Sequence, residues 1–467
     1  MSAATSPPAP LVPGEPERTV PVLQDWAQMV KISPRLYYRP GDWSSVGPFV
    51  ASVARGELGP RRLRVPGSLH SCSTIASTDA AMLDLCDLPR TMDWDPGDGG
   101  VTVSANWPLR DFLAALAARG KSITATGGTD EQSLAGLIST NTAPATPAHT
   151  VYELVDWIEY VTLGPAGSPL TRRVARGEPG FQAAICSLGA IGVITRMHFA
   201  LVDELFFQTT QVIADVDDLI ADLDATSAKY LFWRVMWIQA TDKGLLWAAN
   251  PIPKSQAVPN GDYPPDAAEH WLLVAFKLMQ KLDHTGARMN WMEHLLLEAL
   301  ELFYRKPQVF TGPMRNMLPV DRSATLRVGM AEWSFDPKDL PAVRGAMTDY
   351  FTRNRWPNLP IEMELTRTDD YFMSAWNWSG LPYIVKFNFQ YLLDVCTAPA
   401  DLDDLTAHLR GCWDHLNQKG LRFKAHWGKL NFLDPAAVKE RYQLDEFRPM
   451  INPVFLNQYL VDRLGPA

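Results

Sequence analysis

The sequence predicts an α+β fold built from two parts. Segments typical of strands and of helices alternate along most of the chain, and the strands become richer in aromatic residues after about residue 206. The 467 residues exceed what one hydrophobic core usually serves, which favours two domains. With 46% hydrophobic and 20% charged residues, the composition is that of an ordinary globular protein.

Net charge and cysteine usage exclude several classes of function. A formal net charge of −9 argues against a nucleic-acid partner and against a basic membrane-binding face. The five cysteines have no CxxC spacing, which indicates a reduced, cytoplasmic protein with neither a disulfide framework nor a metal site. Residues 1–30 are rich in proline and lack a secretory signal pattern, so we expect a flexible tail there. The most apolar long segment, residues 269–282, is interrupted by Lys277 and Lys281, which excludes a membrane span.

The first part, residues 31–205, mixes strands and helices. Residues 61–67 and 101–106 have the β-branched and alternating pattern of strands. Residues 108–120 have apolar side chains spaced by three and four and end at Gly120, which predicts a helix with a glycine cap. Two further strands are expected within residues 153–164 and 190–202.

The second part, residues 206–425, begins with a predicted hairpin. Two aromatic segments within residues 230–250 flank a turn at residues 241–244, and a proline-rich loop follows. Helices are expected at residues 269–282, 291–306 and 338–354, and strands at residues 327–336, 360–367 and 383–393. Residues 426–467 form a last, largely helical segment.

Two loops of small residues are the first candidates for a binding site. In "PGSLHSCS", Gly67 and the serines allow backbone N–H groups to converge on a phosphate, although a plain surface turn has the same composition. The segment from Thr124 to Thr142 also lacks the bulky residues of a core strand. Two such loops about 60 residues apart suit a long dinucleotide with a flat ring system. No GxGxxG follows a first strand, so a Rossmann fold is not supported.

Four motifs together resemble a known family. "VPGSLHSCSTIA" (Val65–Ala76), "GGTDEQSLAGLIST" (Gly127–Thr140), "SLGAIGVIT" (Ser187–Thr195) and "HWGK" (His426–Lys429) resemble the vanillyl-alcohol-oxidase flavoproteins, and more narrowly the aldonolactone and alditol oxidase branch. The ending "INPVFLNQYL" (Ile451–Leu460) is similar to that of the same branch. The resemblance covers most of the chain. It implies a PCMH-type FAD-binding domain followed by a substrate domain whose antiparallel sheet lies over the flavin.

The resemblance also implies which residues hold FAD. The loop histidine of the family bonds covalently to the 8α-methyl of FAD, and here it would be His70; a histidine that only hydrogen-bonds within its turn is the alternative. The chain departs from the family at Thr142-Ala143-Pro144, where Thr-His-Gly is usual. The implied cofactor residues besides His70 are Pro66, Gly67, Ser68, Leu69, Ser71, Gly127, Gly128, Thr129, Ser133, Gly136, Ser139, Thr140, Ile194 and Lys429.

Alternation along two strands identifies candidate catalytic residues. Glu362 and Glu364 share one face of their strand, and Lys386 and Asn388 share one face of the next, which could equally be a solvent-facing sheet. In the family a Glu-x-Arg and a His-x-Thr on such strands line the active site. The chain keeps only Glu362, because Glu364 replaces the arginine and Lys386 replaces the histidine. Lys429 of "HWGK" would lie near the N1–C2 carbonyl region of the flavin and stabilise its anionic reduced form; a surface-turn lysine is the alternative.

These observations predict an FAD-dependent oxidase. It would remove hydride from a C–H beside an OH or an amine, with O₂ as the acceptor and H₂O₂ as a product. The altered polar set, and the loop of Trp376 and Trp378, favour an aromatic or amine-bearing substrate over a simple polyol or sugar lactone. Glu362 is the expected base for the hydroxyl proton. Two alternatives remain: a flavin-binding protein of the same fold with non-redox, isomerising or lost activity, and a dehydrogenase that uses another acceptor.

Overall fold

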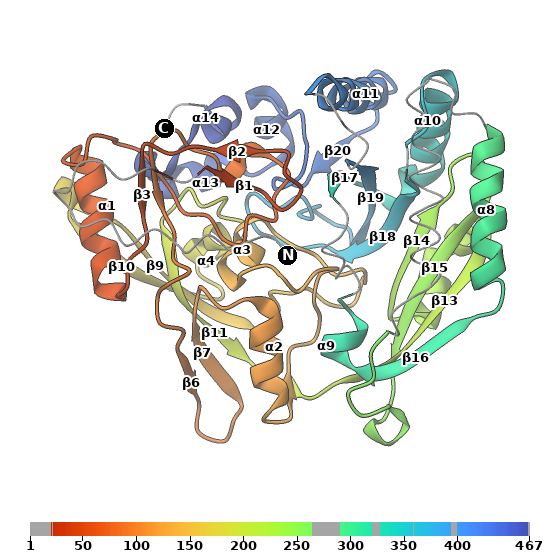
Figure 1. Cartoon of the computed structure of the whole chain (residues 1–467), viewed down its shortest axis with the longest axis horizontal. Helices are drawn as coiled ribbons and strands as arrows, with labels where there is room; N and C mark the ends of the chain where they lie inside the picture. The colour runs from red at the N-terminus through yellow and green to blue at the C-terminus, as the bar shows by residue number, and fades with distance from the viewer. Residues whose placement is uncertain are drawn as a thin grey trace.

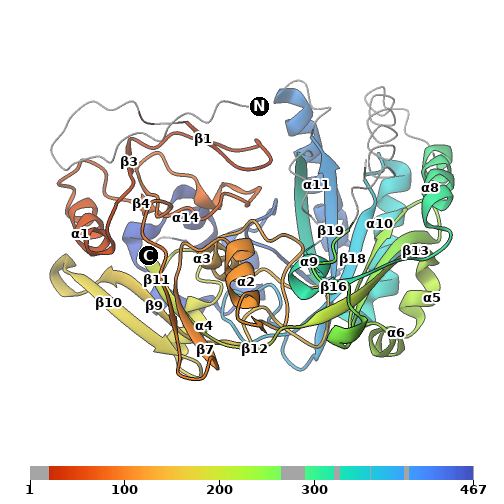
Figure 2. The same cartoon turned by 60° about the horizontal axis from the view of Figure 1, so that its bottom comes forward.

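The chain forms two sheet-based lobes that face one another (Figure 1). The computed structural model describes residue 20 and residues 22–263, 290–319, 327–357, 359–393 and 399–465. Strands of the first lobe lie on the left of Figure 1 and those of the second on the right, and both views show this division (Figure 2). The mixed α+β class predicted from the sequence is confirmed.

The first lobe is built on an antiparallel five-stranded sheet. Its strands have the order β10-β9-β11-β7-β6. They are β6 (Met92–Trp94), β7 (Gly100–Ser104), β9 (Val155–Leu163), β10 (Pro169–Ala175) and β11 (Val193–Ala200). Helices α1 (Val46–Arg55), α2 (Leu109–Ala117), α3 (Leu134–Ser139) and α4 (Pro179–Ala184) belong to the same lobe. A parallel three-stranded sheet, β3 (Leu36–Tyr38), β5 (Ala81–Leu83) and β4 (Leu63–Arg64), lies beside it, and β8 (Lys121–Ser122) pairs with β12 (Val202–Asp203).

Apolar spacing explains the position of α2. Leu109, Phe112, Leu113 and Leu116 repeat at intervals of three and four residues, and all four are buried. The helix ends at Ala117, somewhat earlier than expected, and Gly120 takes a left-handed backbone with φ of 67° in the turn that follows. Glycine adopts this conformation without the steric cost that a Cβ imposes.

The second lobe is an antiparallel sheet of eight strands in the order β16-β13-β15-β14-β18-β19-β17-β20. The strands are β13 (Phe206–Asp215), β14 (Phe232–Trp237), β15 (Lys243–Pro251), β16 (Gln308–Pro313), β17 (Val328–Phe335), β18 (Ile361–Arg367), β19 (Tyr383–Leu392) and β20 (Phe423–Ala425). This sheet spans the range predicted for the substrate domain, although the boundaries as domain limits stay a prediction. β14 and β15 form the expected hairpin, but Lys243 and Gly244 belong to β15 rather than to the turn.

Helices flank this sheet. α5 (Val216–Ala221), α6 (Leu223–Lys229), α8 (Asn290–Tyr304), α9 (Met314–Met317), α10 (Leu340–Arg353) and α11 (Pro399–Gln418) connect its strands. α8 and α10 lie on the side of the sheet away from the first lobe (Figures 1 and 2). The helix expected at residues 269–282 lies outside the described residues. No helix in the described part of the chain has the length and apolar run needed to cross a bilayer.

The C-terminal segment returns to the first lobe. After β20 the chain forms α12 (Pro435–Arg441), α13 (Leu444–Phe447) and α14 (Gln458–Leu464). The Asn457 amide donates to the carbonyls of Thr74, Ile75 and Ser77 at 3.1, 3.0 and 2.7 Å. The motif near the end of the chain therefore holds the segment that directly follows the His70 loop.

Part of the segment expected to be a flexible tail forms a hairpin. Residues 1–19 and 21 lie outside the described residues, but β1 (Leu23–Gln24) pairs with β2 (Lys31–Ile32), and Asp25 and Ala27 are buried between them. The prediction of a flexible tail to residue 30 is wrong for this hairpin. The prediction was based on the proline content of the segment. The apolar and aromatic residues after Pro21 instead form the hairpin.

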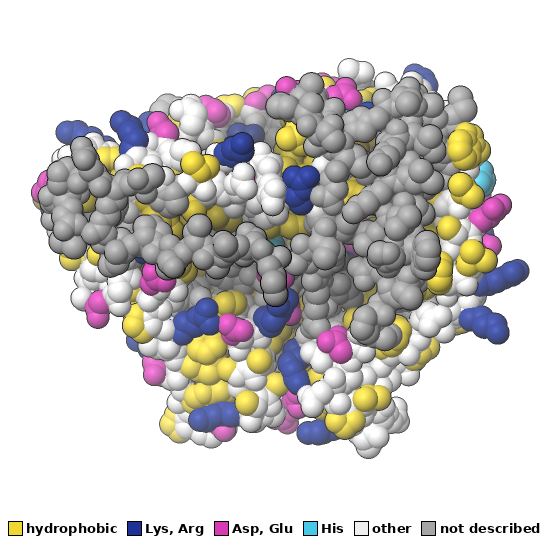
Figure 3. All heavy atoms as spheres, viewed as in Figure 1, with side chains coloured by type: hydrophobic (Ala, Val, Ile, Leu, Met, Phe, Trp, Pro, Cys, Tyr) yellow, Lys and Arg dark blue, Asp and Glu magenta, His cyan; other side chains and the backbone are white. Residues whose placement is uncertain are grey.

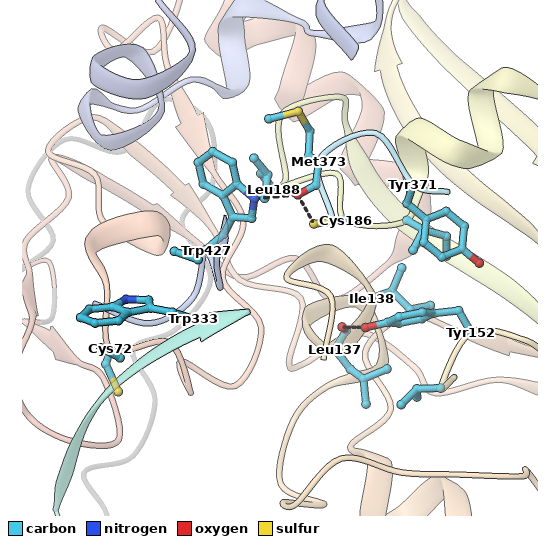
Figure 4. Close-up of a cluster of buried hydrophobic side chains, with 14 of the residues drawn as sticks. Cys72, Leu137, Ile138, Tyr152, Cys186, Leu188, Trp333, Tyr371, Met373 and Trp427 are labelled. Carbon is cyan, nitrogen blue, oxygen red and sulfur yellow. Dashed lines mark hydrogen bonds between the residues drawn. The ribbon is translucent and has the colours of Figure 1, made fainter. Parts of the chain in front are cut away.

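Buried side chains join the two lobes. Figure 4 shows the Trp427 indole and the Cys186 thiol both pointing at the Met373 carbonyl, to which they donate at 2.7 and 3.2 Å. Trp427 belongs to the C-terminal segment, Cys186 follows α4, and Met373 lies in the loop after β18. Three segments far apart in the sequence are thus fixed to each other.

Candidate active site

Two adjoining cavities share part of their lining: the first lies within the first lobe, and the second lies between the two lobes. The first, of about 380 Å³, is lined by both small-residue loops and by the segment Leu188–Ile194. The second, of about 450 Å³, is lined by Gly127–Thr129 on one side and by the polar face of the large sheet on the other. His70, Ser71, Gln132 and Thr140 line both. A ligand with two chemically different ends would fit this shape.

The structure brings the expected cofactor residues together around these cavities. The first cavity contains Pro66, Gly67, Ser68, Leu69, Ser133, Gly136, Ser139 and Ile194 in its wall, and the second contains Gly127, Gly128, Thr129 and Lys429. The two loops touch, because a Cβ on Gly67 would lie 2.5 Å from Ser133 Oγ and 3.3 Å from Gly136 Cα. Only glycine allows this approach.

The donors at this site suit a phosphate group. No backbone amide from Gly67 to Ser71 donates a hydrogen bond to another described residue. Leu69 has a left-handed backbone with φ of 55°, a conformation often found where successive N–H groups converge on an anion. In the second cavity the Thr126 hydroxyl is buried with no hydrogen-bond partner among the described residues. These donors without a partner among the described residues fit an FAD molecule, whose phosphates and ring accept such hydrogen bonds.

His70 is held from two sides. The Trp26 indole stacks on the imidazole with ring centroids 5.8 Å apart, and its N–H donates to the His70 carbonyl at 2.9 Å. His70 Nε2 lies 3.5 Å from Glu131 Oε2. Burial lowers the pKa of His70, and Glu131 opposes this effect without reversing it. The lowered pKa favours the neutral form of the imidazole.

The polar face of the large sheet is buried instead of solvent-facing. Glu362, Glu364, Lys386 and Asn388 all line the second cavity and are 2 to 7% exposed. The register explains their meeting: Glu362 pairs with Asn388, and Glu364 pairs with Lys386. Neighbouring residues in such pairs present their side chains on the same face.

Sequence reasoning missed two charged members of this face. Arg234 on β14 pairs in register with Glu364, and its Nη1 donates to Glu362 Oε1 at 2.6 Å. Glu332 on β17 accepts from Lys429 Nζ at 2.6 Å and lies 3.8 Å from Lys386 Nζ. Both residues are single charges within otherwise apolar strands, "FWRVMW" and "GMAEWSF", and that interruption is the signal in the sequence.

The charges of this face are balanced and coupled. Three carboxylates (Glu332, Glu362, Glu364) face three cations (Arg234, Lys386, Lys429). Burial would raise the pKa of Glu332, but Lys386 and Lys429 outweigh it and lower that pKa to about 2. Glu362 also has a lowered pKa, because Arg234, Asn388 and the lysines outweigh its burial. Burial raises the pKa of Glu364 to about 7, and Lys386 limits this rise.

The tryptophans of the loop after β18 do not line the second cavity. Trp376 is 1% exposed, and its N–H donates to the Asn141 carbonyl at 2.9 Å. The Trp378 N–H donates to Ala375 O at 3.1 Å and to Ser334 Oγ at 3.3 Å. The aromatic residues that line the cavity are instead Trp26, Phe232 and Trp247.

Comparisons with known proteins place the chain among the flavoprotein oxidoreductases. Cholesterol oxidase from Brevibacterium sterolicum has a similar fold, with a TM-score of 0.73 at 13% identity over 98% of this chain and 100% of that one. Residues 197–461 match the D-arabinono-1,4-lactone oxidase family. The chain belongs to that family, whose members use FAD.

Individual relatives support this placement. The D-arabinono-1,4-lactone oxidase of Saccharomyces cerevisiae is 30% identical over 245 residues, 51% of this chain and 45% of that protein. The L-gulonolactone oxidase of Mus musculus is 27% identical over 46% of this chain and 48% of that protein. The L-gulono-1,4-lactone dehydrogenase of Mycobacterium tuberculosis is 24% identical over 96% of this chain and 100% of that protein. The chain thus matches about half the length of the yeast and mouse proteins.

Proposed function

We propose that this protein oxidises a small polyhydroxylated substrate of the aldonolactone class at a carbon that carries a hydroxyl group. The observation that carries the proposal is the buried, charge-balanced polar face across the cavity from Gly127–Thr129. Bound FAD supplies the two-electron chemistry by accepting a hydride from that carbon. The protein's side chains bind and orient the hydroxyl groups and receive the hydroxyl proton.

Two premises for an aromatic or amine-bearing substrate are not met. Trp376 and Trp378 point into protein instead of the cavity. Lys386 Nζ lies 2.6 Å from Glu364 Oε1, so the protein itself supplies the cation that this carboxylate needs. A neutral, multiply hydroxylated substrate suits a wall rich in hydrogen-bond donors and acceptors of balanced charge.

Trp247 extends the wall with an aromatic surface. Its N–H donates to the Tyr263 hydroxyl at 2.9 Å, and the Arg234 guanidinium lies 5.4 Å from its ring centroid. Tyr263 in turn donates to the Met317 carbonyl at 2.9 Å. A ring fixed in this way offers a flat surface for the less polar side of a sugar-like ring.

For the cofactor, we propose that His70 carries FAD covalently and that Lys429 lies at the edge of the ring site. The neutral imidazole and its stacking on Trp26 support the first role. Lys429 lines the second cavity and is oriented by Glu332 and by Asn388 Oδ1 at 3.3 Å. A cation held there would stabilise negative charge on a reduced flavin.

Anaerobic mixing tests the proposed substrate class. L-gulono-1,4-lactone and D-arabinono-1,4-lactone should bleach the flavin absorbance, whereas benzyl alcohol and benzylamine should not. Bleaching by the aromatic compounds alone would contradict the proposal, and no bleaching by any donor would favour the non-redox alternative. Admitting air then separates an oxidase, which we propose, from a dehydrogenase.

A dehydrogenase remains the second candidate on one observation. A Cβ on Gly127 would lie 2.4 Å from the Thr142 Cγ2 methyl, so this side chain already occupies part of the space beside the glycine. Thr142 also lines the second cavity. A methyl group in this position would restrict the approach of O₂ to the cofactor.

A further inference from the structure

Glu362 and Glu364, two residues apart on β18, differ in the hydrogen bonds they accept. Both oxygens of Glu362 are occupied: Oε1 accepts from Arg234, and Oε2 accepts from Asn388 Nδ2 at 2.9 Å and Gln390 Nε2 at 3.1 Å. Glu364 Oε1 accepts from Lys386 Nζ, and among the described residues Glu364 has no second donor. Glu364 therefore retains an oxygen that can accept a further proton.

The two glutamates also differ in exposure, and Glu364 is again the more available of the two. The Glu362 side chain is 3% exposed, and that of Glu364 is 10% exposed, although both line the second cavity. A proton acceptor must come within hydrogen-bond distance of the group that it deprotonates. Glu362 is enclosed by its own donors, whereas Glu364 is the more exposed of the two and keeps an oxygen without a donor among the described residues.

We infer that Glu364, and not Glu362, accepts the hydroxyl proton of the substrate, and that Glu362 fixes Arg234 in the substrate-binding wall. The inference rests on the proposed function. The O–H bond of the substrate breaks and its proton forms a carboxylic acid on Glu364. The carbon-bound hydrogen leaves with two electrons to FAD, and a carbonyl group forms on the substrate. Lys386 holds Glu364 in place and favours its ionised form before the reaction.

The surroundings of Glu364 give it a suitable basicity. The charged and titratable groups that face it are Lys386 on β19, Arg234 on β14, Glu332 on β17, Glu362 on its own strand, and His426 and Lys429 after β20. Burial and the two neighbouring glutamates raise its pKa, and Lys386 lowers it, with a result of about 7. A base with a pKa near the working pH combines a large ionised fraction with strong proton affinity.

The other candidates are weaker bases. Glu362 has a lowered pKa and three donors to its oxygens. Burial lowers the pKa of His426 to about 3, and its Nδ1 already accepts from the Gly428 amide at 3.1 Å. In the family pattern an arginine stands at the position of Glu364. The role of Glu364 as proton acceptor would therefore be specific to this chain.

Matched variants test the inference in the flavin-loaded protein. The probe is L-gulono-1,4-lactone, and the rate of anaerobic flavin reduction is measured from pH 5 to pH 9. The wild-type rate should rise with pH and level off above about 7, because only ionised Glu364 accepts a proton. Glu364→Gln should lose this rise and fall by roughly 10²-fold, the usual effect of removing a general base. Glu362→Gln should keep the rise, and Glu364→Asp should restore part of the rate.

An infrared titration gives a readout that does not need turnover. The titration is done in an Asp369→Asn background, because burial raises the pKa of Asp369 to about 7 as well. In that background, a carboxylic acid band that disappears near pH 7 should be present with Glu364 intact and in Glu362→Gln, and absent in Glu364→Gln. Persistence of that band in Glu364→Gln, or loss of the pH rise in Glu362→Gln alone, would overturn the inference. If the lactone reduces no flavin at any pH, the proposed substrate class fails, while the band still decides whether Glu364 titrates near neutral pH. If Glu364→Gln does not fold, Glu364→Asp is titrated in its place. A band whose position and midpoint pH are unchanged in Glu364→Asp would count against the assignment of the band to Glu364.

Discussion

Arg234 and Glu362 reach each other across neighbouring strands and form a buried ion pair of 2.6 Å in the wall of the second cavity. They lie 128 residues apart in the sequence. Their side chains are 14% and 3% exposed. A buried pair of this kind is costly to break from one side, since the remaining charge keeps its desolvation cost without a partner.

Arg234→Met should therefore destabilise the protein by roughly 3–5 kcal/mol, the usual cost of leaving a buried charge unpaired. The pKa of Glu362 should rise, because its largest stabilising cation is gone. Chemical denaturation measures the free energy of unfolding. Arg173→Met is the matched control, as Arg173 pairs with Glu159 at 3.2 Å while 54% exposed, and we expect a loss below about 1 kcal/mol. Equal losses in the two variants would contradict a special role for the buried pair.

His70→Ala should release the flavin on acid precipitation, while wild type should give a coloured pellet. The reason is that, of the two described histidines that line the second cavity, only His70 belongs to the loop expected to carry the link, whereas the other, His426, already accepts from the Gly428 amide. His149→Ala is the control, since His149 bonds to Glu153 at 2.8 Å and lines neither cavity. A colourless wild-type pellet would show that the proposed bond does not form.

Trp26→Ala should lower the fraction of covalently bound flavin. Trp26 stacks on His70 and donates to its carbonyl, so its removal frees the ring to turn. Trp26→Phe keeps a ring and should retain more of the covalent flavin than Trp26→Ala. Trp43→Ala is the control, because Trp43 also donates to a backbone carbonyl, that of Pro89 at 2.9 Å, but lines neither cavity. If Trp26→Ala and Trp43→Ala behave alike, positioning by Trp26 is excluded.

Gly127→Ala should slow reoxidation of the reduced flavin by air more than it slows reduction by substrate. The new methyl would occupy the space beside the ring site and press on Thr142 Cγ2. Thr142→Ser removes that methyl, so the double variant should recover if the effect is crowding. Stopped-flow absorbance separates the two half-reactions. Equal slowing of both would indicate a general distortion of the loop instead of restricted access.

Asp369→Asn should change how stability depends on pH. Burial raises the pKa of Asp369 to about 7, although Ser374 Oγ donates to it at 2.7 Å. A carboxyl group with a raised folded-state pKa contributes stability that is present below its unfolded pKa near 4 and is lost as the pH rises through about 7. The wild type should therefore lose a few kcal/mol more than the variant between pH 4 and pH 8. Parallel unfolding free energies across this range would contradict the assignment.

The period-two pattern of a strand explains why much of the polar face was predictable. Glu362, Glu364, Lys386 and Asn388 alternate with large apolar residues, so local sequence alone assigns them to common faces. The orientation of that face toward a cavity came from the family resemblance, because a solvent-facing sheet has the same pattern.

On the face of the molecule in Figure 3, described acidic and basic side chains are intermixed, as on an ordinary solvent-facing surface.

Arg234 and Glu332 could not be placed in the same way. Each joins the site through pairing between strands that are far apart in sequence, β14 with β18 and β17 with β19. Local periodicity carries no information about which strands become neighbours. The expectation that Trp376 and Trp378 line the site has the same origin, since the sequence placed both residues in a loop but not the direction in which their rings point.

The hairpin of β1 and β2 holds Trp26 against the loop that we propose carries the cofactor. A shortened protein that begins at residue 31, where the FAD-binding domain was expected to begin, would keep every residue of the His70 loop. It would lose Trp26 and its contacts with Leu69 and His70. Such a protein would still contain the complete eight-stranded sheet. The flavin that stays bound to this protein after denaturation would then measure the contribution of Trp26, which lies outside all of the cofactor motifs.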